Sequence, residues 1–540
     1  MNTFPEKPFL TTDFSDKGGG VDFLGLRLVN LGILSDELLP GLNNQTRDAG
    51  SFCVGAWIPW KFTQLWKNAE FNISNFNLFR QYIEIIFSSH MTDGSDTHAL
   101  FGKPKNRIGN GQKVKFPCPV SFEKVKRTEA TSIYAAPLYG PALKYMELLQ
   151  KFPAAAIDGS STGIPLTSED DDTKKLMTAL EKHLIESRFY KKLKISKDHK
   201  INEDEAADLG NHGLCASSFL SFDLATKKSF LKKLLPTEAN DSGFKRRLTA
   251  KLIISTIEQV GPIDGWDLRM IWYTGLMTNG KKLNLSDELE KHRKIWAVFM
   301  ARQYQRYFLE KLLVFFEQSL IEGCHSIEEV SLRAIDELTK CNISTQSFAE
   351  LLNIECGKLT KNKTIDLSET SKLWNNTVHF QHKFFEYLEV DESEDANNSA
   401  RAISLLIGWY LRVKSWGIDE IKVPFLKYGD SDRVSISWFI GWIDKRSTLD
   451  LKQLLNELFQ ELIFSQHIRI ALSRFDGESQ KIRFILDDKG IVPTKGTTDI
   501  GTREVPWMAD RLDAFIDLLC DVDVISKSDD LIKLKNVINI

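Results

Sequence analysis

The amino-acid sequence predicts a mainly α-helical, multidomain protein with short β-hairpins. Apolar residues recur every three or four positions over long stretches, as they do on the buried face of a helix. The chain has 540 residues, which at roughly 100–200 residues per domain corresponds to several domains. Hydrophobic residues make up 42% of it and aromatic residues 11%, enough material for more than one buried core. This composition excludes a largely disordered chain.

The balance of charge excludes a general attraction to polyanions. Lys and Arg number 70 and Asp and Glu 73, so the formal net charge is −3. No overall positive field draws the protein onto nucleic acid or an acidic membrane surface. Any contact with nucleic acid must therefore come from a local basic patch.

The N-terminal segment, the apolar stretches and the cysteines together predict a cytoplasmic protein. The segment Met1–Lys7 is polar and does not lead into an apolar core, so we expect no signal peptide. The apolar stretch Leu309–Ile321 is interrupted by charges and is too short to span a bilayer, so we expect no membrane partner. Seven cysteines are spread along the chain without a Cys-x-x-Cys pair, which predicts free thiols in a reducing compartment.

Two polar stretches divide the chain. Ala154–Thr173 combines Gly and Ser with the acidic run Glu169–Asp172, and Asp391–Ser399 is acidic and amide-rich. Such residues bury too little apolar surface to order themselves, which is typical of linkers. We therefore expect an N-terminal region 1–155, a linker 156–175, a helical middle domain 176–390, an acidic linker 391–399 and a C-terminal α+β domain 400–540.

The N-terminal region is predicted to form short helices. An apolar run ends at Leu38–Gly41, where Pro and Gly should terminate a helix, and further helical runs follow at Phe52–Trp66 and Phe76–Phe87. A winged-helix module and a plain helical bundle are both compatible with this pattern.

A basic segment follows at Gly102–Arg127. The turn-former Gly109–Gly111 predicts a β-hairpin within it. A basic hairpin can lie along phosphates and displace their counterions, but a solvated surface loop has the same composition. The candidate DNA-binding residues are Lys103, Lys105, Arg107, Lys113, Lys115, Lys124, Lys126 and Arg127.

The middle domain contains the clearest helix, over Glu288–Leu320, with Asn284 or Ser286 as its cap. Aromatic residues recur along it at helical spacing, which is typical of a core seam rather than of a base-stacking platform. Near the start of this helix, a set of cations is expected to supply a basic surface: Lys291, Arg293, Lys294, Arg302 and Arg306.

The C-terminal domain is predicted to contain helices before and after a β-hairpin. We expect a helix over Ala402–Trp416, a short strand at Ile421–Pro424 and a helix that begins at a capping box formed by Ser447 and Asp450. Alternating apolar residues before and after Asp476-Gly477 predict two paired strands, 468–472 and 482–486. A final helix is expected over Trp507–Cys520, and a winged-helix-like domain is one arrangement of these elements.

Motifs for known chemistry are largely missing. The sequence contains neither a Walker A phosphate loop nor a Gly-x-Ser-x-Gly nucleophile elbow. His379 and His382 lack the glutamate of a zinc protease helix, so we expect no metal and no cofactor. The nearest approach to a catalytic pair is Glu420 with Lys422, because metal-dependent nucleases place an acid and a lysine on one strand face. His467, at the end of an apolar helix, is expected to be a hydrogen-bonded structural residue.

Motifs near both ends of the chain resemble one group of proteins. The first is Asp22–Leu26, followed by Leu38–Gly41, Thr46-Arg47 and Trp57, and the second is Ser465–Arg469 with Arg483-Phe484. Together they resemble poorly characterised bacterial proteins of antiphage defence islands, with a departure at residues 45–49, where those proteins carry more aromatic residues. The resemblance implies a subunit of a multi-gene defence system, such as one of the Druantia type.

These observations favour a non-catalytic recognition or scaffold subunit of a bacterial antiviral defence system. Its expected partners are the other subunits of that system, with DNA as a further partner through the basic segment. Two alternatives stay open: a metal-dependent nuclease that acts on invading DNA through Glu420 and Lys422, and a winged-helix DNA-binding regulator.

Overall fold

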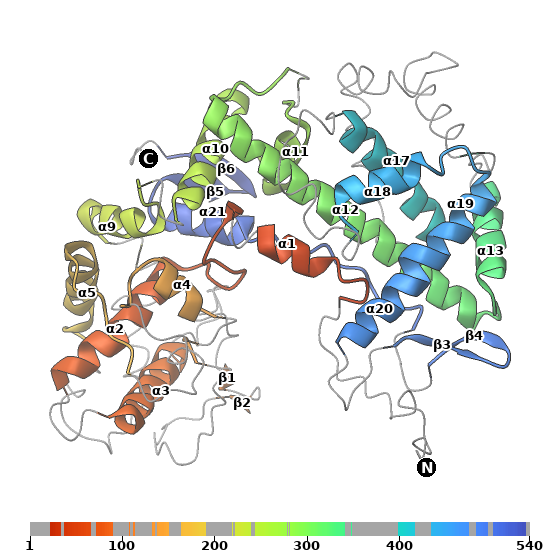
Figure 1. Cartoon of the computed structure of the whole chain (residues 1–540). Coiled ribbons are helices and arrows are strands. Elements are labelled where there is room, and N and C mark those ends of the chain that lie inside the picture. The colour runs from red at the N-terminus through yellow and green to blue at the C-terminus, as the bar shows by residue number, and fades with distance from the viewer. Residues whose placement is uncertain are drawn as a thin grey trace, which may run out of the picture. The chain divides into compact units, whose positions relative to one another are not determined.

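The structure is a computed structural model of the whole chain (Figure 1). It describes residues 22–33, 37–65, 72–89, 107–108, 112–113, 132–134, 138–150, 164–188, 190, 219, 222–238, 243–277, 279, 281–340, 347, 398–415, 434–474, 482–494, 500–535 and 540.

The chain forms two compact units, and each is assembled from three separate stretches. The first unit comprises Met1–Ile33, Arg269–Asn284 and Arg293–Met508, and the second comprises Leu34–Leu268, Leu285–His292 and Ala509–Ile540. Residues near the two ends of the chain therefore meet residues from its middle in both units.

Helices dominate both units, which confirms the predicted fold class. The first unit holds α1 (Arg27–Ile33), most of α12 (Asp287–Ile321), α13 (Ile327–Lys340), α17 (Asn398–Ser415), α18 (Ile436–Asp444), α19 (Leu451–Leu458), a π-helix (Phe459–Ser465), α20 (Gln466–Ser473) and the hairpin of β3 (Phe484–Asp487) with β4 (Gly490–Pro493). The second unit holds α2 (Ala49–Leu65), α3 (Ile73–Ser89), α4 (Gly140–Tyr145), α5 (Asp171–Leu184), α9 (Leu224–Leu234), α10 (Phe244–Val260), α21 (Leu512–Asp521) and two hairpins, β1 (Arg107–Ile108) with β2 (Gln112–Lys113) and β5 (Ile525–Ser528) with β6 (Leu531–Leu534). Helix α11 (Gly265–Thr274) begins in the second unit and ends in the first.

The aromatic stripe of α12 is a core seam, as predicted. Trp296, Phe308 and Phe316 are fully buried. The ring of Phe308 packs against Trp409 of α17 with the ring centroids 5.8 Å apart, and Phe316 packs against Phe459 of the π-helix at 5.9 Å. Burial of side chains of this size is the main source of stability for a helical core.

The prediction of a basic surface near the start of α12 is wrong for three of its five residues. Arg293, Arg302 and Arg306 are buried. Each guanidinium donates a hydrogen bond to a main-chain carbonyl: Arg293 to Trp272 of α11, Arg302 to Val434 and Arg306 to Pro506. A cation can be buried when it satisfies such carbonyls.

Elements of the C-terminal domain differ from the prediction in five places. Residues 468–472 form the end of α20 rather than a strand, and the hairpin turns at Asp488-Lys489 instead of Asp476-Gly477. The helix after residue 447 is capped by Asp450, whose carboxylate accepts from the Gln453 N–H at 2.8 Å, while the Ser447 hydroxyl donates to the Asp444 carbonyl. The last helix begins at Leu512 rather than Trp507, and the β5–β6 hairpin was not predicted.

The predicted linker 156–175 ends earlier than expected. Helix α5 begins at Asp171, and the carboxylate of Asp170 caps it by accepting from the Thr173 N–H at 2.9 Å. Acidic residues are favoured there because the first turn of a helix carries partial positive charge. The other division of the chain, at 391–399, lies almost wholly outside the described residues and stays a prediction, as do the domain boundaries.

The hairpin predicted around Gly109–Gly111 is confirmed, since β1 and β2 pair antiparallel with Arg107 opposite Lys113. Winged-helix modules are not confirmed in the described residues at either end of the chain. No helix among the described residues is long and apolar enough to cross a membrane. Cys53, Cys324 and Cys520, the cysteines within the described ranges, are free thiols.

Replacement of the α19 cap tests the position of this helix end. We expect Asp450→Ala to lower the free energy of unfolding by about 1 kcal/mol, because the Gln453 N–H loses its acceptor. Urea unfolding followed by circular dichroism measures the change. Ser447→Ala is the control, and a larger loss for it than for Asp450→Ala would contradict the assignment of the cap.

Candidate binding groove

Most of the residues predicted to act on DNA lie outside the described residues. This holds for the nuclease pair Glu420 and Lys422 and for six of the basic candidates: Lys103, Lys105, Lys115, Lys124, Lys126 and Arg127. Arg107 and Lys113 are placed by their backbone as opposite partners in the β1–β2 ladder. Catalysis by the pair and DNA binding by the segment therefore stay predictions.

The start of the N-terminal motif, Asp22–Leu26, lies beside the C-terminal motif in the first unit, whereas Leu38–Gly41, Thr46-Arg47 and Trp57 belong to the second unit. The Gln466 side chain donates to the Leu24 carbonyl at 2.8 Å, and Arg474 donates to the Asp22 carbonyl at 2.6 Å. The carboxylate of Asp22 in turn accepts from the Leu26 N–H at 2.8 Å, at the start of α1. These contacts form one cluster that joins α20 and Arg474 to the segment Asp22–Leu26.

His467 is the buried centre of this cluster, and it is hydrogen-bonded as the sequence predicts. The Arg483 N–H donates to its Nε2 at 3.0 Å, so the ring proton is on Nδ1, which donates to the Phe23 carbonyl at 3.2 Å. Burial lowers the pKa of His467 from 6.5 to about 3, and the nearby charges of Arg483 and Arg503 act in the same direction. The imidazole is therefore neutral at pH 7, and both of its nitrogen atoms hold backbone groups.

Two arginines enclose Phe23 beside this histidine. The guanidinium carbons of Arg483 and Arg503 each lie 4.7 Å from the centroid of the Phe23 ring. Arg483 Nε donates to Glu317 of α12 at 2.9 Å, and the Gly501 N–H donates to the same buried carboxylate at 3.2 Å. The cluster is a packed joint between chain segments rather than an open site.

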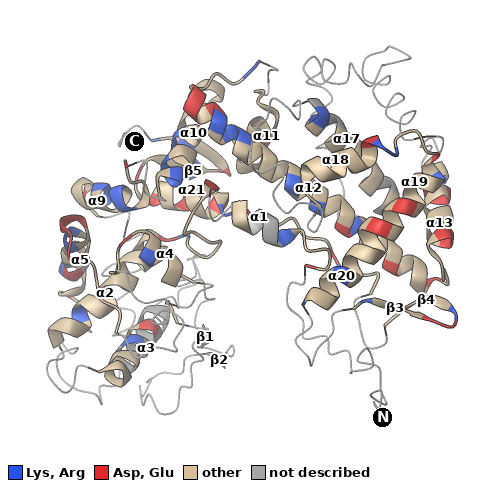
Figure 2. Cartoon of the chain, in the orientation of Figure 1, with Lys and Arg blue, Asp and Glu red and all other residues tan. Residues whose placement is uncertain are grey.

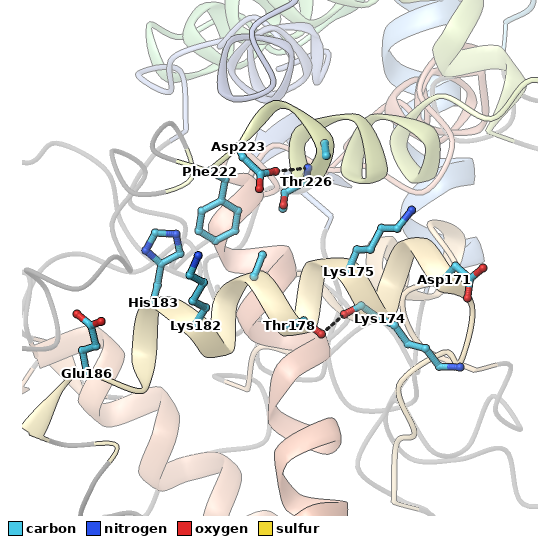
Figure 3. Close-up of a pocket in the computed structure, with 12 residues that line it drawn as sticks. Asp171, Lys174, Lys175, Thr178, Lys182, His183, Glu186, Phe222, Asp223 and Thr226 are labelled. Atoms are coloured by element: carbon cyan, nitrogen blue, oxygen red, sulfur yellow. Dashed lines mark hydrogen bonds between the residues drawn. The ribbon is translucent and has the colours of Figure 1, made fainter.

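An open groove lies in the second unit, along α5 and the start of α9 (Figure 3). Its volume is about 840 Å³. Residues of one face of α5 line the groove, and the segment that leads into α9 closes one side of it. The lining residues are Asp171, Lys174, Lys175, Thr178, Ala179, Lys182, His183, Glu186, Phe222, Asp223, Ala225 and Thr226.

The opposite face of α5 fixes the groove in place. Leu176, Leu180 and Leu184 are buried at helical spacing, and α5 packs against α2 and α9. Between them, Glu181 accepts from the indole N–H of Trp57 at 2.6 Å and pairs with the buried ammonium of Lys61. An anchored helix presents its outer face without rearrangement, which lowers the entropic cost of binding.

Charges of both signs line the groove. In the part of the chain that the structure describes, none of Lys174, Lys175 and Lys182 forms a salt bridge. The acids at the start of α5 pair with α9 instead, Asp170 with Lys233 at 2.8 Å and Asp172 with Lys232 at 3.4 Å. Figure 2 shows this mixture of charges on α5 and α9.

Asp223 is the acidic group on the α9 side. Its carboxylate caps α9 by accepting from the Thr226 N–H at 2.7 Å (Figure 3). This hydrogen bond, together with a smaller contribution from Lys182, lowers the pKa of Asp223. The carboxylate is therefore ionised at pH 7, and part of its charge is balanced by the positive end of the helix that it caps.

A flat aromatic surface closes one end of the groove. The rings of His183 and Phe222 are nearly parallel, with centroids 4.8 Å apart and an angle of 11° between the planes (Figure 3). The ring of Phe222 is buried and that of His183 is half-buried, so the histidine ring is the accessible part of this end of the groove.

The hydroxyl of Thr178 is engaged by its own helix, because it donates to the Lys174 carbonyl at 2.8 Å. Within the described ranges, no group of three or more His, Cys, Asp or Glu side chains is arranged to hold a metal ion.

The sequence prediction missed this groove because the acidic run before it resembles a linker. A signal was nevertheless present. Asp170 precedes Thr173 by three residues, as a helix cap does, and buried leucines follow at helical spacing from Leu176.

Comparisons of the chain with protein-family models, with curated proteins and with solved structures find no match.

The buried histidine makes the first unit sensitive to acid. Because the pKa of folded His467 lies near 3 and its ordinary value is 6.5, the unfolded chain binds an additional proton between these pH values. Stability contributed by neutral His467 is complete above pH 6.5 and falls as the pH drops toward 3, by up to about 1.4 kcal/mol per pH unit. Urea unfolding between pH 7 and pH 4 should show a shallower pH dependence for His467→Gln than for the wild type. An equal change for the exposed control His325→Gln would contradict this assignment.

Loss of the buried carboxylate should destabilise the joint around Phe23. Glu317→Gln leaves the guanidinium of Arg483 without its buried counter-charge, and we expect a loss of about 3–5 kcal/mol in unfolding free energy. Glu322→Gln, which removes an exposed salt bridge on the same helix end, should cost less than about 1 kcal/mol. Urea unfolding followed by tryptophan fluorescence measures both, and equal losses would contradict the role of Glu317.

Proposed function

We propose that the chain is a non-catalytic recognition or scaffold subunit of a cytoplasmic bacterial antiviral defence complex, and that a partner protein binds in the groove along α5. One observation carries the binding role: the groove holds three lysines without salt bridges on a helix that is anchored from behind. Unpaired cations in a concave surface are available to a ligand at little cost of desolvating existing ion pairs.

The composition of the groove supports a protein as the partner. Asp171, Glu186 and Asp223 lie among the lysines, so a ligand of uniform charge meets repulsion as well as attraction. A protein segment can instead present both signs of charge and an apolar side chain. The antiviral context rests on the resemblance of the motifs at residues 22–57 and 465–484 to defence-island proteins.

Co-purification from the native operon tests this function. We expect the tagged chain to retain other gene products in stoichiometric amounts after a wash in high salt, because protein interfaces with apolar cores persist when charges are screened. Mass spectrometry and gel densitometry measure their identity and ratio.

A solitary protein that carries DNA released by salt would contradict the proposal and favour the DNA-binding alternatives. Mg²⁺-dependent cleavage that is lost in Glu420→Ala would then identify a nuclease. DNA binding weakened by charge reversal at Lys103, Lys105 and Lys126 would identify the basic segment as its site.

A further inference from the structure

We infer that the groove along α5 binds an extended acidic segment of the partner protein, with two carboxylates about three residues apart and an apolar residue at one end. The inference rests on the proposed function, because it names the chemistry of the partner that the groove would hold.

The spacing of the lysines sets the spacing of the carboxylates. Lys175 and Lys182 are seven residues apart on α5, which places them about 10 Å apart along the helix axis. An extended peptide advances roughly 3.3–3.6 Å per residue, so two acidic residues three positions apart also span about 10 Å. Such a segment can bring one carboxylate to each lysine at the same time.

The acidic residues of the groove limit the length of the negative stretch. Asp171 lies in the first turn of α5 and Asp223 caps α9, so the positive end of a helix balances part of each charge. Glu186, just beyond the last residue of α5, lacks this compensation and repels further negative charge. The attractive part of the groove is therefore the short stretch between Lys174 and Lys182.

The apolar end of the segment follows from the aromatic surface. Beyond Lys182, the stacked rings of His183 and Phe222 line the end of the groove, with the histidine ring as their accessible part. A leucine or phenylalanine next to the acidic pair would cover this surface and remove it from water.

Nucleic acid fits these features less well. A phosphate backbone carries negative charge along its whole length and would place it beside Glu186 as well as beside the lysines. A single-stranded oligonucleotide is therefore the competing ligand in the test.

Direct binding to the full chain tests the inference. The probe is a fluorescein-labelled peptide of about eight residues, long enough to cover α5 when extended, with two glutamates three positions apart and a terminal leucine. One matched peptide carries glutamine in place of both glutamates, one carries the glutamates side by side, and an oligothymidylate replaces the peptide in the last series. Fluorescence anisotropy at low and at high salt measures each affinity.

The lysines are tested by charge reversal with a matched control. The double variant Lys175→Glu with Lys182→Glu should bind the acidic peptide about tenfold more weakly than the wild type, since two attractive pairs become repulsive. The control Lys228→Glu with Lys533→Glu makes the same change in net charge at two exposed lysines of the second unit that do not line the groove. Circular dichroism shows whether both variants fold.

Support requires that the acidic peptide binds best with its glutamates three positions apart and that the groove variant, but not the control, loses this binding. Equal binding of the glutamine peptide, or an equal loss in both variants, overturns the inference. Preferential binding of oligothymidylate that the groove variant loses also overturns it and identifies a nucleic-acid site.

The two proposals fail separately. Partners that co-purify equally with the wild type and with the groove variant leave the subunit function in place and reject the groove as their site. A chain without stoichiometric partners rejects the subunit function, whatever the peptide does.

Discussion

Two buried carboxylates on one face of α12 constrain the first unit. Glu310 and Glu317 are seven residues apart, two turns of the helix, and both are inaccessible to water. A buried charge is tolerable only when it is paired, and each is paired with arginines from distant parts of the chain. Glu310 holds Arg27 of α1, and Glu317 holds Arg483 at the start of the β3–β4 hairpin. The positions of α1 and of that hairpin on α12 are thus determined by charge pairing as much as by apolar packing.

The same pairing explains where prediction from the sequence succeeded and where it failed. The aromatic period of α12 predicted the helix to within one residue at each end, Glu288–Leu320 against Asp287–Ile321. Arg302 was expected on the surface because local periodicity records a charge but not its partner. That partner is the Val434 carbonyl, 132 residues further along the chain. A side chain buried by so distant an acceptor leaves no local signal in the sequence.

The groove was missed for a different physical reason. Glu169–Asp172 has the composition of a solvated linker, but the same carboxylates are stabilised when they meet the N-terminus of α5 and the lysines of α9. Lys175 and Lys182 lie on one face because the residues between them form a helix. The DNA-binding and nuclease candidates could be compared with the structure only at Arg107 and Lys113, where the predicted hairpin is present.

The π-helix Phe459–Ser465 determines how far α20 is rotated about the helix axis relative to α19. A π-helical turn contains more residues than an α-helical turn. In an α-helix, each residue is rotated by about 100° from the one before it. Removal of a single residue here would turn every later side chain of α20 through that angle, and His467 would no longer point at the Phe23 carbonyl. Across related chains, this stretch should therefore accept substitutions much more readily than insertions or deletions.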